Sequence, residues 1–301
     1  MWILFAFLAP ALYAVAEIFD EYLSNRGFKN ISSLVFFACL LNFIFVPIIF
    51  LIERPVMPSL HLLLPLVGVA ITNLLYLYPY YKSLKIEDTS VVSAFFSFGK
   101  IVIPVFAFIF IGEVLEIRQY IGIGIIILGN TFLAFHSTRK KIKISKAFFL
   151  ILFASVVLAI EGILFKYMFE NGMTWSTAIG GQLLISGFLG CGILLLFKRS
   201  RRNIWQDRTH YKKNFALFFS EELFTVLAVA AETYAISLAP VSLVKGVGMA
   251  IPIFVLTYTV AVKRFNPKFF HEDTHRSVVI KKILIFGLII LGLVLIGVNE
   301  F

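Results

Sequence analysis

The sequence predicts an all-α polytopic membrane protein with ten transmembrane helices, arranged as two inverted five-helix repeats. Three observations predict this fold: the composition, a series of apolar runs, and an internal repeat. Of 301 residues, 60% are apolar and only 15% are charged, whereas soluble domains average about 45–50% apolar and about 25% charged residues. Because a bilayer-spanning helix needs about 20 apolar residues, the chain has room for roughly ten spans.

The apolar runs between polar breaks define the spans in chain order. They are 2–22, 31–52, 60–81, 89–111, 118–136, 146–168, 176–198, 214–237, 240–262 and 278–299. Prolines at 47, 104 and 252 lie inside spans and predict kinks. The first ten residues contain no basic segment, so we expect no removable signal peptide.

The basic residues predict the orientation. Of the 27 Lys and Arg residues, 22 lie on the five connections of one side, and only Arg54 and Arg118 lie on the other. The positive-inside rule therefore places the basic connections in the cytoplasm and both termini on the non-cytoplasmic side of a plasma (inner) membrane. The net charge of +10 is then an orientation signal with attraction for anionic lipid, and not a nucleic-acid surface. A monomer or a homodimer is expected.

The two halves of the chain resemble each other. "SVVSAFFSFGKIVIPVFAFIF" (90–110) aligns with "SLVKGVGMAIPIFVLTYTVAV" (242–262), and the first spans of the halves align with Glu17 opposite Glu161. Five spans is an odd number, so the second half must insert upside down, as in transporters that work by alternating access. The expected domains are a first repeat at 1–137, a basic linker at 138–145 and an inverted repeat at 146–301.

Residues 90–130 resemble the ten-helix EamA-like branch of the drug/metabolite transporter superfamily. The most specific features are Gly112-Glu113 at the end of the fourth span and the spaced Gln119, Gly122 and Gly129 that follow. The resemblance implies that spans 1, 3, 4, 6, 8 and 9 line a central cavity. Two departures stand out: Lys100 occupies the position that matches Pro252, and the second half lacks the Gly-Glu pair.

Several ionisable residues lie inside spans, where each costs about 2.5–3.5 kcal/mol and usually faces a cavity or a partner. Glu17 and Glu161 lie deep in the first spans of the two halves. Lys100 is near the middle of the fourth span and needs a carboxylate or an anionic ligand. Its expected partners are Glu221 and Glu222, of which only one is expected to face the cavity.

Other polar residues have a simpler structural interpretation. Glu232 and Lys245 lie near the outer ends of adjacent spans and are expected to form an ion pair. Asp20 and Glu21 are expected to be a solvated helix end. The patch "YLYPYY" (76–81) predicts an interfacial aromatic belt, with substrate contact as the alternative for Tyr76 and Tyr80.

Eleven residues are therefore candidates for binding a substrate or coupling its transport. They are Glu17, Asn73, Tyr76, Tyr80, Lys100, Glu161, Glu221, Glu222, Thr225, Glu232 and Lys245.

One enzyme motif is present. His271-Glu272-Asp273-Thr274-His275 matches H-E-x-x-H, but no spacing supplies a third zinc ligand, and the motif lies in a basic connection. A membrane zinc protease is a remote alternative, and the motif is interpreted as accidental. The chain also lacks a phosphate loop and a nucleophile elbow. No enzyme activity, catalytic residue, metal or cofactor is expected.

The expected function is secondary transport of a small polar metabolite. The excess of acidic over basic groups within the spans suits an amine-bearing or zwitterionic substrate, and the buried carboxylates suit proton coupling, with exchange as the other driving force. The main alternative is a flippase for a lipid or a lipid-linked headgroup.

Overall fold

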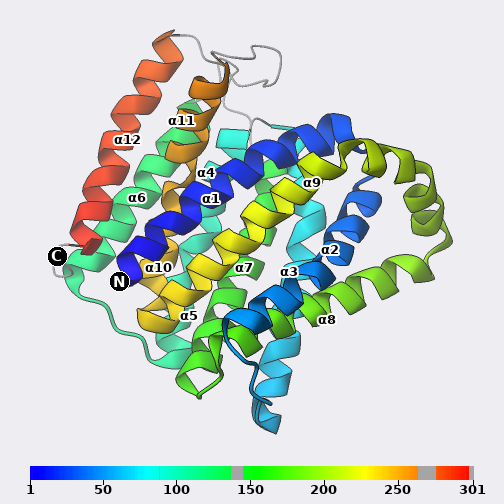
Figure 1. Ribbon diagram of the computed structural model, residues 1–301. Coiled ribbons are helices and arrows are strands. Elements are labelled where there is room, and N and C mark those ends of the chain that lie inside the picture. The colour runs from blue at the N-terminus through cyan, green and yellow to red at the C-terminus, as the bar shows by residue number, and fades with distance from the viewer. Residues whose placement is uncertain (88, 137–144, 264–275, 298–301) are drawn as a thin grey trace.

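The computed structural model describes residues 1–87, 89–136, 145–263 and 276–297, which form helices without a strand (Figure 1). The α-helices are α1 (Trp2–Tyr22), α2 (Ile31–Ile52), α3 (Leu60–Leu84), α4 (Thr89–Lys100), α5 (Val102–Ile111), α6 (Ile117–His136), α7 (Lys146–Glu170), α8 (Trp175–Leu196), α9 (Lys198–Leu238), α10 (Val241–Val247), α11 (Ile251–Lys263) and α12 (Arg276–Gly297). A π-helical turn, Leu23–Gly27, extends α1, and a 3₁₀ turn, Gly248–Ala250, joins α10 to α11.

The helices are long and apolar enough for a membrane protein. In the described part of the chain, eight helical stretches meet the length and hydropathy of a span, and two shorter apolar stretches, Ile117–Leu133 and Leu284–Gly297, bring the number to ten. The predicted fold class, an all-α polytopic membrane protein, is confirmed. α1 begins and α12 ends on the same side of the molecule (Figure 1), as an even number of spans requires.

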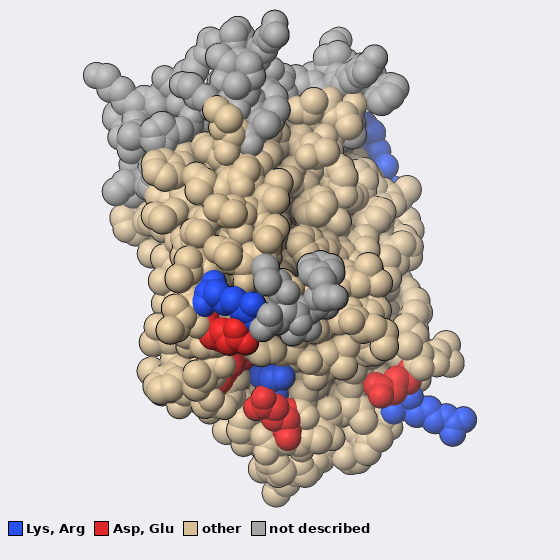
Figure 2. All heavy atoms as spheres, turned by 90° about the vertical axis from the view of Figure 1, so that its left-hand side faces the viewer, with Lys and Arg blue, Asp and Glu red and all other residues tan. Residues whose placement is uncertain are grey.

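The face formed by α6 and α12 has the apolar surface expected of a protein that contacts lipid. Figure 2 shows a broad band without charged side chains on this face, with a few acidic and basic groups toward its lower end. The two helices approach closely, since a Cβ added to Gly122 would come within 2.8 Å of the carbonyl oxygen of Gly292. Small residues at such a crossing allow the van der Waals packing that holds helices together in lipid.

Two of the predicted spans are broken in the middle. The fourth span divides at Ile101 into α4 and α5, and the ninth divides at the 3₁₀ turn between α10 and α11. Proline explains both breaks, because Pro104 cannot donate a backbone hydrogen bond to Lys100 and Pro252 cannot donate one to Gly248. The third predicted kink is not a break, since α2 continues through Pro47.

The basic segment 198–213, predicted as a loop, is the beginning of α9, so that prediction is wrong. Hydropathy does not find this helix because its apolar side is short. Asp207 and Tyr211, one turn apart, face α2: the Asp207 carboxylate accepts a 3.0 Å hydrogen bond from the backbone N–H of Asn30, and Tyr211 stacks on Phe37 with ring centroids 4.0 Å apart. The basic side chains of this segment point outward.

The helix pairing suits an inverted repeat. α1 packs along α9, as Figure 1 shows, and α7 packs along α3. In the expected repeat these two pairs are equivalent, because each places the first span of one half against the third span of the other half. α2 pairs with α8 and α6 pairs with α12, which relates each span to its counterpart. The division into repeats stays a prediction, and residues 138–144 of the expected linker lie outside the described residues.

Candidate functional site

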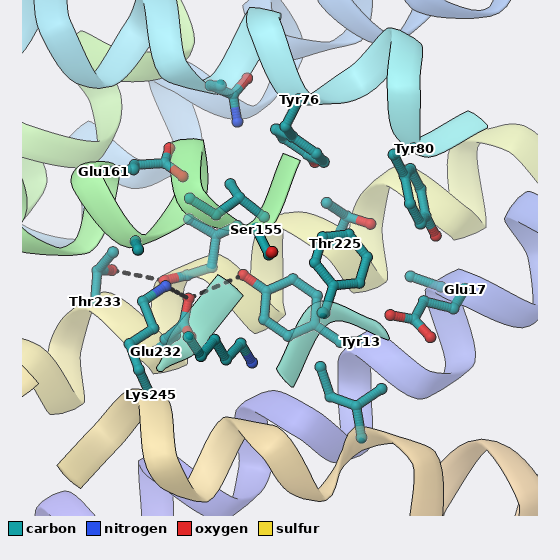
Figure 3. A pocket seen from close by; sticks show the side chains of 18 of the residues that line it. Tyr13, Glu17, Tyr76, Tyr80, Ser155, Glu161, Thr225, Glu232, Thr233 and Lys245 are labelled. Atoms are coloured by element: carbon teal, nitrogen blue, oxygen red, sulfur yellow. Dashed lines mark hydrogen bonds and ion pairs between the residues drawn. The ribbon is translucent and has the colours of Figure 1, made fainter. Parts of the chain in front are cut away.

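A cavity lies in the middle of the bundle, between α1, α3, α4, α7, α9 and α10, and encloses about 950 Å³ together with the space that opens from it (Figure 3). These helices correspond to the spans that the family resemblance implies. Nine of the eleven candidate residues line this central cavity, namely Glu17, Asn73, Tyr76, Tyr80, Lys100, Glu161, Thr225, Glu232 and Lys245. Their roles in binding or coupling stay predictions.

Lys245 and Glu232 form the ion pair that the sequence predicts. The Lys245 Nζ lies 2.7 Å from Glu232 Oε2, and both side chains are nearly buried. Tyr13 donates a 3.3 Å hydrogen bond to the same carboxylate oxygen, so Glu232 lies between the two (Figure 3). The lysine side chain passes close to α7, where a Cβ on Gly162 would be 2.8 Å from its Cε. Glycine at this position therefore leaves the space through which Lys245 reaches the cavity.

Glu17 and Glu161, the two glutamates that the expected repeat makes equivalent, lie on opposite sides of the cavity, with Tyr13 between them in Figure 3. Glu17 accepts a hydrogen bond from the Ser93 hydroxyl, and Glu161 accepts one from the Gln182 amide. Neither forms a salt bridge within the part of the chain that the structure describes. Two carboxylates thus face the cavity with neutral hydrogen-bond donors beside them.

Lys100 is positioned by the break in its own span, because α4 ends at this residue. Among the described residues its ammonium group has no hydrogen bond or ion pair. It lies near Glu232, since a Cβ on Gly248 would be 3.4 Å from Lys100 Nζ and 3.6 Å from Glu232 Oε1. The expected pairing with Glu221 or Glu222 is wrong: those glutamates line a different cavity, because α9 turns them away from α4.

A second cavity of about 540 Å³ lies between α1, α2, α3, α8 and α9. We call it the acidic cavity, because Asp20, Glu221 and Glu222 line it and no Lys, Arg or His does so among the described residues. Neither glutamate lines the central cavity and both line the acidic cavity, so the expectation that one of the two faces the central cavity is wrong. The reason is that α9 is enclosed by α1, α2 and α8, which leaves a wide arc of its surface buried.

The end of α1 is buried, which corrects the expectation of a solvated helix end. Asp20 is 4% exposed and Glu21 is 8% exposed. Asp20 Oδ2 accepts a 2.9 Å hydrogen bond from the hydroxyl of Tyr80, and Glu21 accepts a 2.6 Å hydrogen bond from the Thr89 hydroxyl. The π-helical turn continues the helix beyond Glu21, so Glu21 does not lie at a free helix end. Tyr80 of α3 and Thr89 of α4 cover this part of α1.

The tyrosines of "YLYPYY" are divided between two environments. Tyr76 lines both cavities, and Tyr80 is buried against Asp20, so neither belongs to an interfacial belt. Tyr78 is 52% exposed and matches the belt interpretation. The helical period explains the division, since residues 76 and 80 share one face of α3 and residue 78 lies on the opposite face.

Sequence reasoning missed several polar residues of the two cavities, among them Ser155 and Thr233 of the central cavity. Tyr13 is one turn before Glu17 on the same face of α1, so the helical period was a usable signal. Asn42 and Gln182 line the acidic cavity from α2 and α8, which the resemblance did not place at a cavity. The only signal that the sequence offered for Asn42 and Gln182 was an amide side chain inside an apolar span.

The family's Gly-Glu pair joins the two halves of the chain. Gly112 ends α5 with φ 67°, the left-handed conformation that glycine adopts at helix ends. The Glu113 carboxylate then accepts hydrogen bonds of 2.7 Å and 3.0 Å from the backbone N–H groups of Val241 and Ser242, at the beginning of α10. A carboxylate at a helix N-terminus is stabilised by the exposed N–H groups and the helix dipole.

The H-E-x-x-H motif, His271 to His275, lies outside the described residues. Within the described residues, no group of three or more His, Cys, Asp or Glu side chains is arranged to hold a metal ion.

Comparison with known proteins relates the first five spans to a transporter family. Residues 1–135 match the model of the EamA-like transporter family. A solved crystal structure superposes on the chain with a TM-score of 0.71 at 13% sequence identity, covering 98% of this chain and 96% of the other, and so shares its fold. No curated protein matches the sequence. The first five spans of this integral multi-pass membrane protein therefore match the EamA-like transporter family, and its fold over nearly the whole chain is that of the solved structure.

Proposed function

We propose that this protein is a secondary transporter that moves a small, amino-acid-like metabolite, amine-bearing or zwitterionic, by alternating access between two inverted halves. The observation that carries the proposal is the central cavity, which holds the carboxylates of Glu17 and Glu161 and the ammonium of Lys100, which forms no ion pair within the described residues. A charge inside a bilayer is costly unless a partner or a water-filled cavity compensates it. A zwitterion offers an anionic group to Lys100 and an ammonium group to a glutamate.

The orientation and surroundings are part of the proposal. The basic connections lie in the cytoplasm, where they attract anionic lipid, and both termini lie on the other side of a plasma (inner) membrane. The functional unit is a monomer or a homodimer. Movement of the halves about their interface exposes the central cavity to each side in turn.

Thermal stabilisation of the detergent-purified protein tests the substrate class, because a ligand that binds only the folded state must stabilise it. The panel contains amino acids, amines, nucleotides, nucleotide sugars and lipid headgroups. We expect amino acids or amines to raise the unfolding temperature and Lys100→Ala to reduce this shift at a given ligand concentration. A shift with lipid-like compounds alone would contradict the proposal and favour a flippase.

We expect transport to be coupled to protons through the buried carboxylates. Replacing Glu17, Glu161 and Glu221 together with glutamine removes three groups that can exchange a proton while keeping their shape. Uptake into proteoliposomes driven by a pH gradient should be lost, whereas Glu170→Gln, at the outer end of α7 and away from both cavities, should leave it unchanged. Undiminished pH-driven flux in the triple variant would rule out this coupling and favour exchange.

A further inference from the structure

The acidic cavity contains more negative groups than the structure compensates. Asp20, Glu221 and Glu222 are 4%, 2% and 5% exposed, and no basic residue lines the cavity among those described. The charges of Asp20 and Glu222 both act on Glu221. Buried like charges are costly without a positive partner. Protons on the carboxyl groups, or a bound cation, must therefore compensate the negative charge of this cavity.

A neutral side chain also points to a ligand. Gln182, on α8, is 1% exposed and lines the acidic cavity. Its amide nitrogen donates to Glu161 of the central cavity, but its carbonyl oxygen has no hydrogen-bond partner among the residues that the structure describes. In the described part of the chain, Asp20 Oδ1 and Glu221 Oε2 are likewise buried and accept no hydrogen bond. A buried acceptor without a donor costs about 1–3 kcal/mol, and three such acceptors around one cavity match the three N–H donors of a primary ammonium group.

The two cavities lie on either side of a common boundary. Five residues line both of them: Asp20, Asn73, Tyr76, Thr225 and Val229. Thr225 donates a 3.0 Å hydrogen bond to Glu221 Oε1 from this boundary. The central cavity therefore offers a cation and carboxylates to a zwitterion, and the acidic cavity offers carboxylates without a basic side chain among the described residues.

We propose that the acidic cavity binds a second cationic group of the substrate, so that the transported compound is a diamino acid: a zwitterionic head by Lys100, and a terminal ammonium among Asp20, Glu221 and Glu222. This inference rests on the proposed function, because it needs the central cavity to hold the zwitterionic head. A methylene chain between the two ends crosses the boundary beside Tyr76 and Val229, which offer it apolar surface. Protons that occupy the carboxylates in the empty protein leave when the ammonium binds.

The test compares lysine with norleucine, which has the same carbon chain but no terminal ammonium. Dissociation constants are measured from the thermal stabilisation of the full-length protein in detergent. We expect lysine to bind about tenfold or more tightly than norleucine, because a hydrogen bond to a charged group contributes about 1.5–3 kcal/mol and 1.4 kcal/mol is a factor of ten. In the Glu221→Gln/Glu222→Gln variant this preference should fall to about twofold or less, and norleucine should bind as before.

The controls separate this inference from the proposed function. Norleucine binding shows that the variant has folded with an intact central cavity, and Glu170→Gln should keep the full preference for lysine. Equal binding of the two amino acids to the unaltered protein, or a preference that survives in the variant, overturns the diamino-acid inference alone. Binding of neither amino acid overturns the proposed substrate class as well. Stabilisation by sodium ions or by acid pH, dependent on the two glutamates and without a preference for lysine, assigns the cavity to an ion or to protons instead.

Discussion

Replacing Glu232 with alanine is expected to destabilise the protein by about 3–5 kcal/mol, because removing one partner of a buried ion pair leaves the other charge uncompensated. The charge left behind is that of Lys245, whose Nζ lies 2.7 Å from Glu232 Oε2 and whose side chain is 9% exposed. Glu232 also accepts a hydrogen bond from Tyr13, which is lost in the same variant. The measurement is the midpoint of unfolding in detergent, by heat or by denaturing surfactant.

The matched control removes both charges. In Glu232→Gln/Lys245→Met the tyrosine keeps a hydrogen-bond acceptor and neither member of the pair leaves its partner's charge behind, so we expect most of the lost stability to return. Lys245→Met alone leaves the glutamate unpaired and should be about as damaging as Glu232→Ala. Equal destabilisation in the single and double variants would mean that the two residues do not act as a pair, which contradicts the prediction.

Replacing Lys100 with alanine is expected to weaken substrate binding about tenfold to a hundredfold, with little loss of stability. The ammonium group has no hydrogen bond or ion pair among the described residues, so its removal breaks neither kind of contact within the protein. A hydrogen bond from an ammonium to an anionic group contributes about 1.5–3 kcal/mol, which gives this range of affinity. Ligand-induced thermal stabilisation and counterflow in proteoliposomes are the two measurements.

Two variants make the result specific to Lys100. Lys100→Arg keeps a positive charge and should keep part of the affinity, although the planar guanidinium is larger and differs in geometry. Lys212→Ala removes an exposed lysine from the basic segment of α9 and should bind substrate normally. An alanine variant that binds and transports like the unaltered protein would remove Lys100 from the site. A large fall in stability without ligand would show that the lysine is structural.

Much of the architecture was predictable because it depends on local properties of the chain. The length of an apolar run decides whether a helix can cross a bilayer, and the ten predicted spans correspond to helical segments of the structure. Proline position predicted two of the helix breaks, since a missing N–H acts within one turn. The pairing of Glu232 with Lys245 was also predictable, because both lie near the same end of consecutive spans and a buried charge needs a partner.

Only the tertiary structure decided which groups share a cavity. Glu221, Glu222 and Lys100 lie at similar depths along their helices, and the sequence suggested that they meet, but the rotation and tilt of α9 place the glutamates in the acidic cavity and leave Lys100 near Glu232. The sequence suggested that Asp20 and Glu21 form a solvated helix end. The residues that bury them belong to α3 and α4, about 60 residues away in the sequence, so no local pattern indicated their burial. The sequence by itself determined a membrane protein of ten spans and which polar groups lie within them. The packing of helices distant in the sequence determined the partners of those groups, because burial and contact between helices depend on rotation and tilt, which hydropathy does not encode.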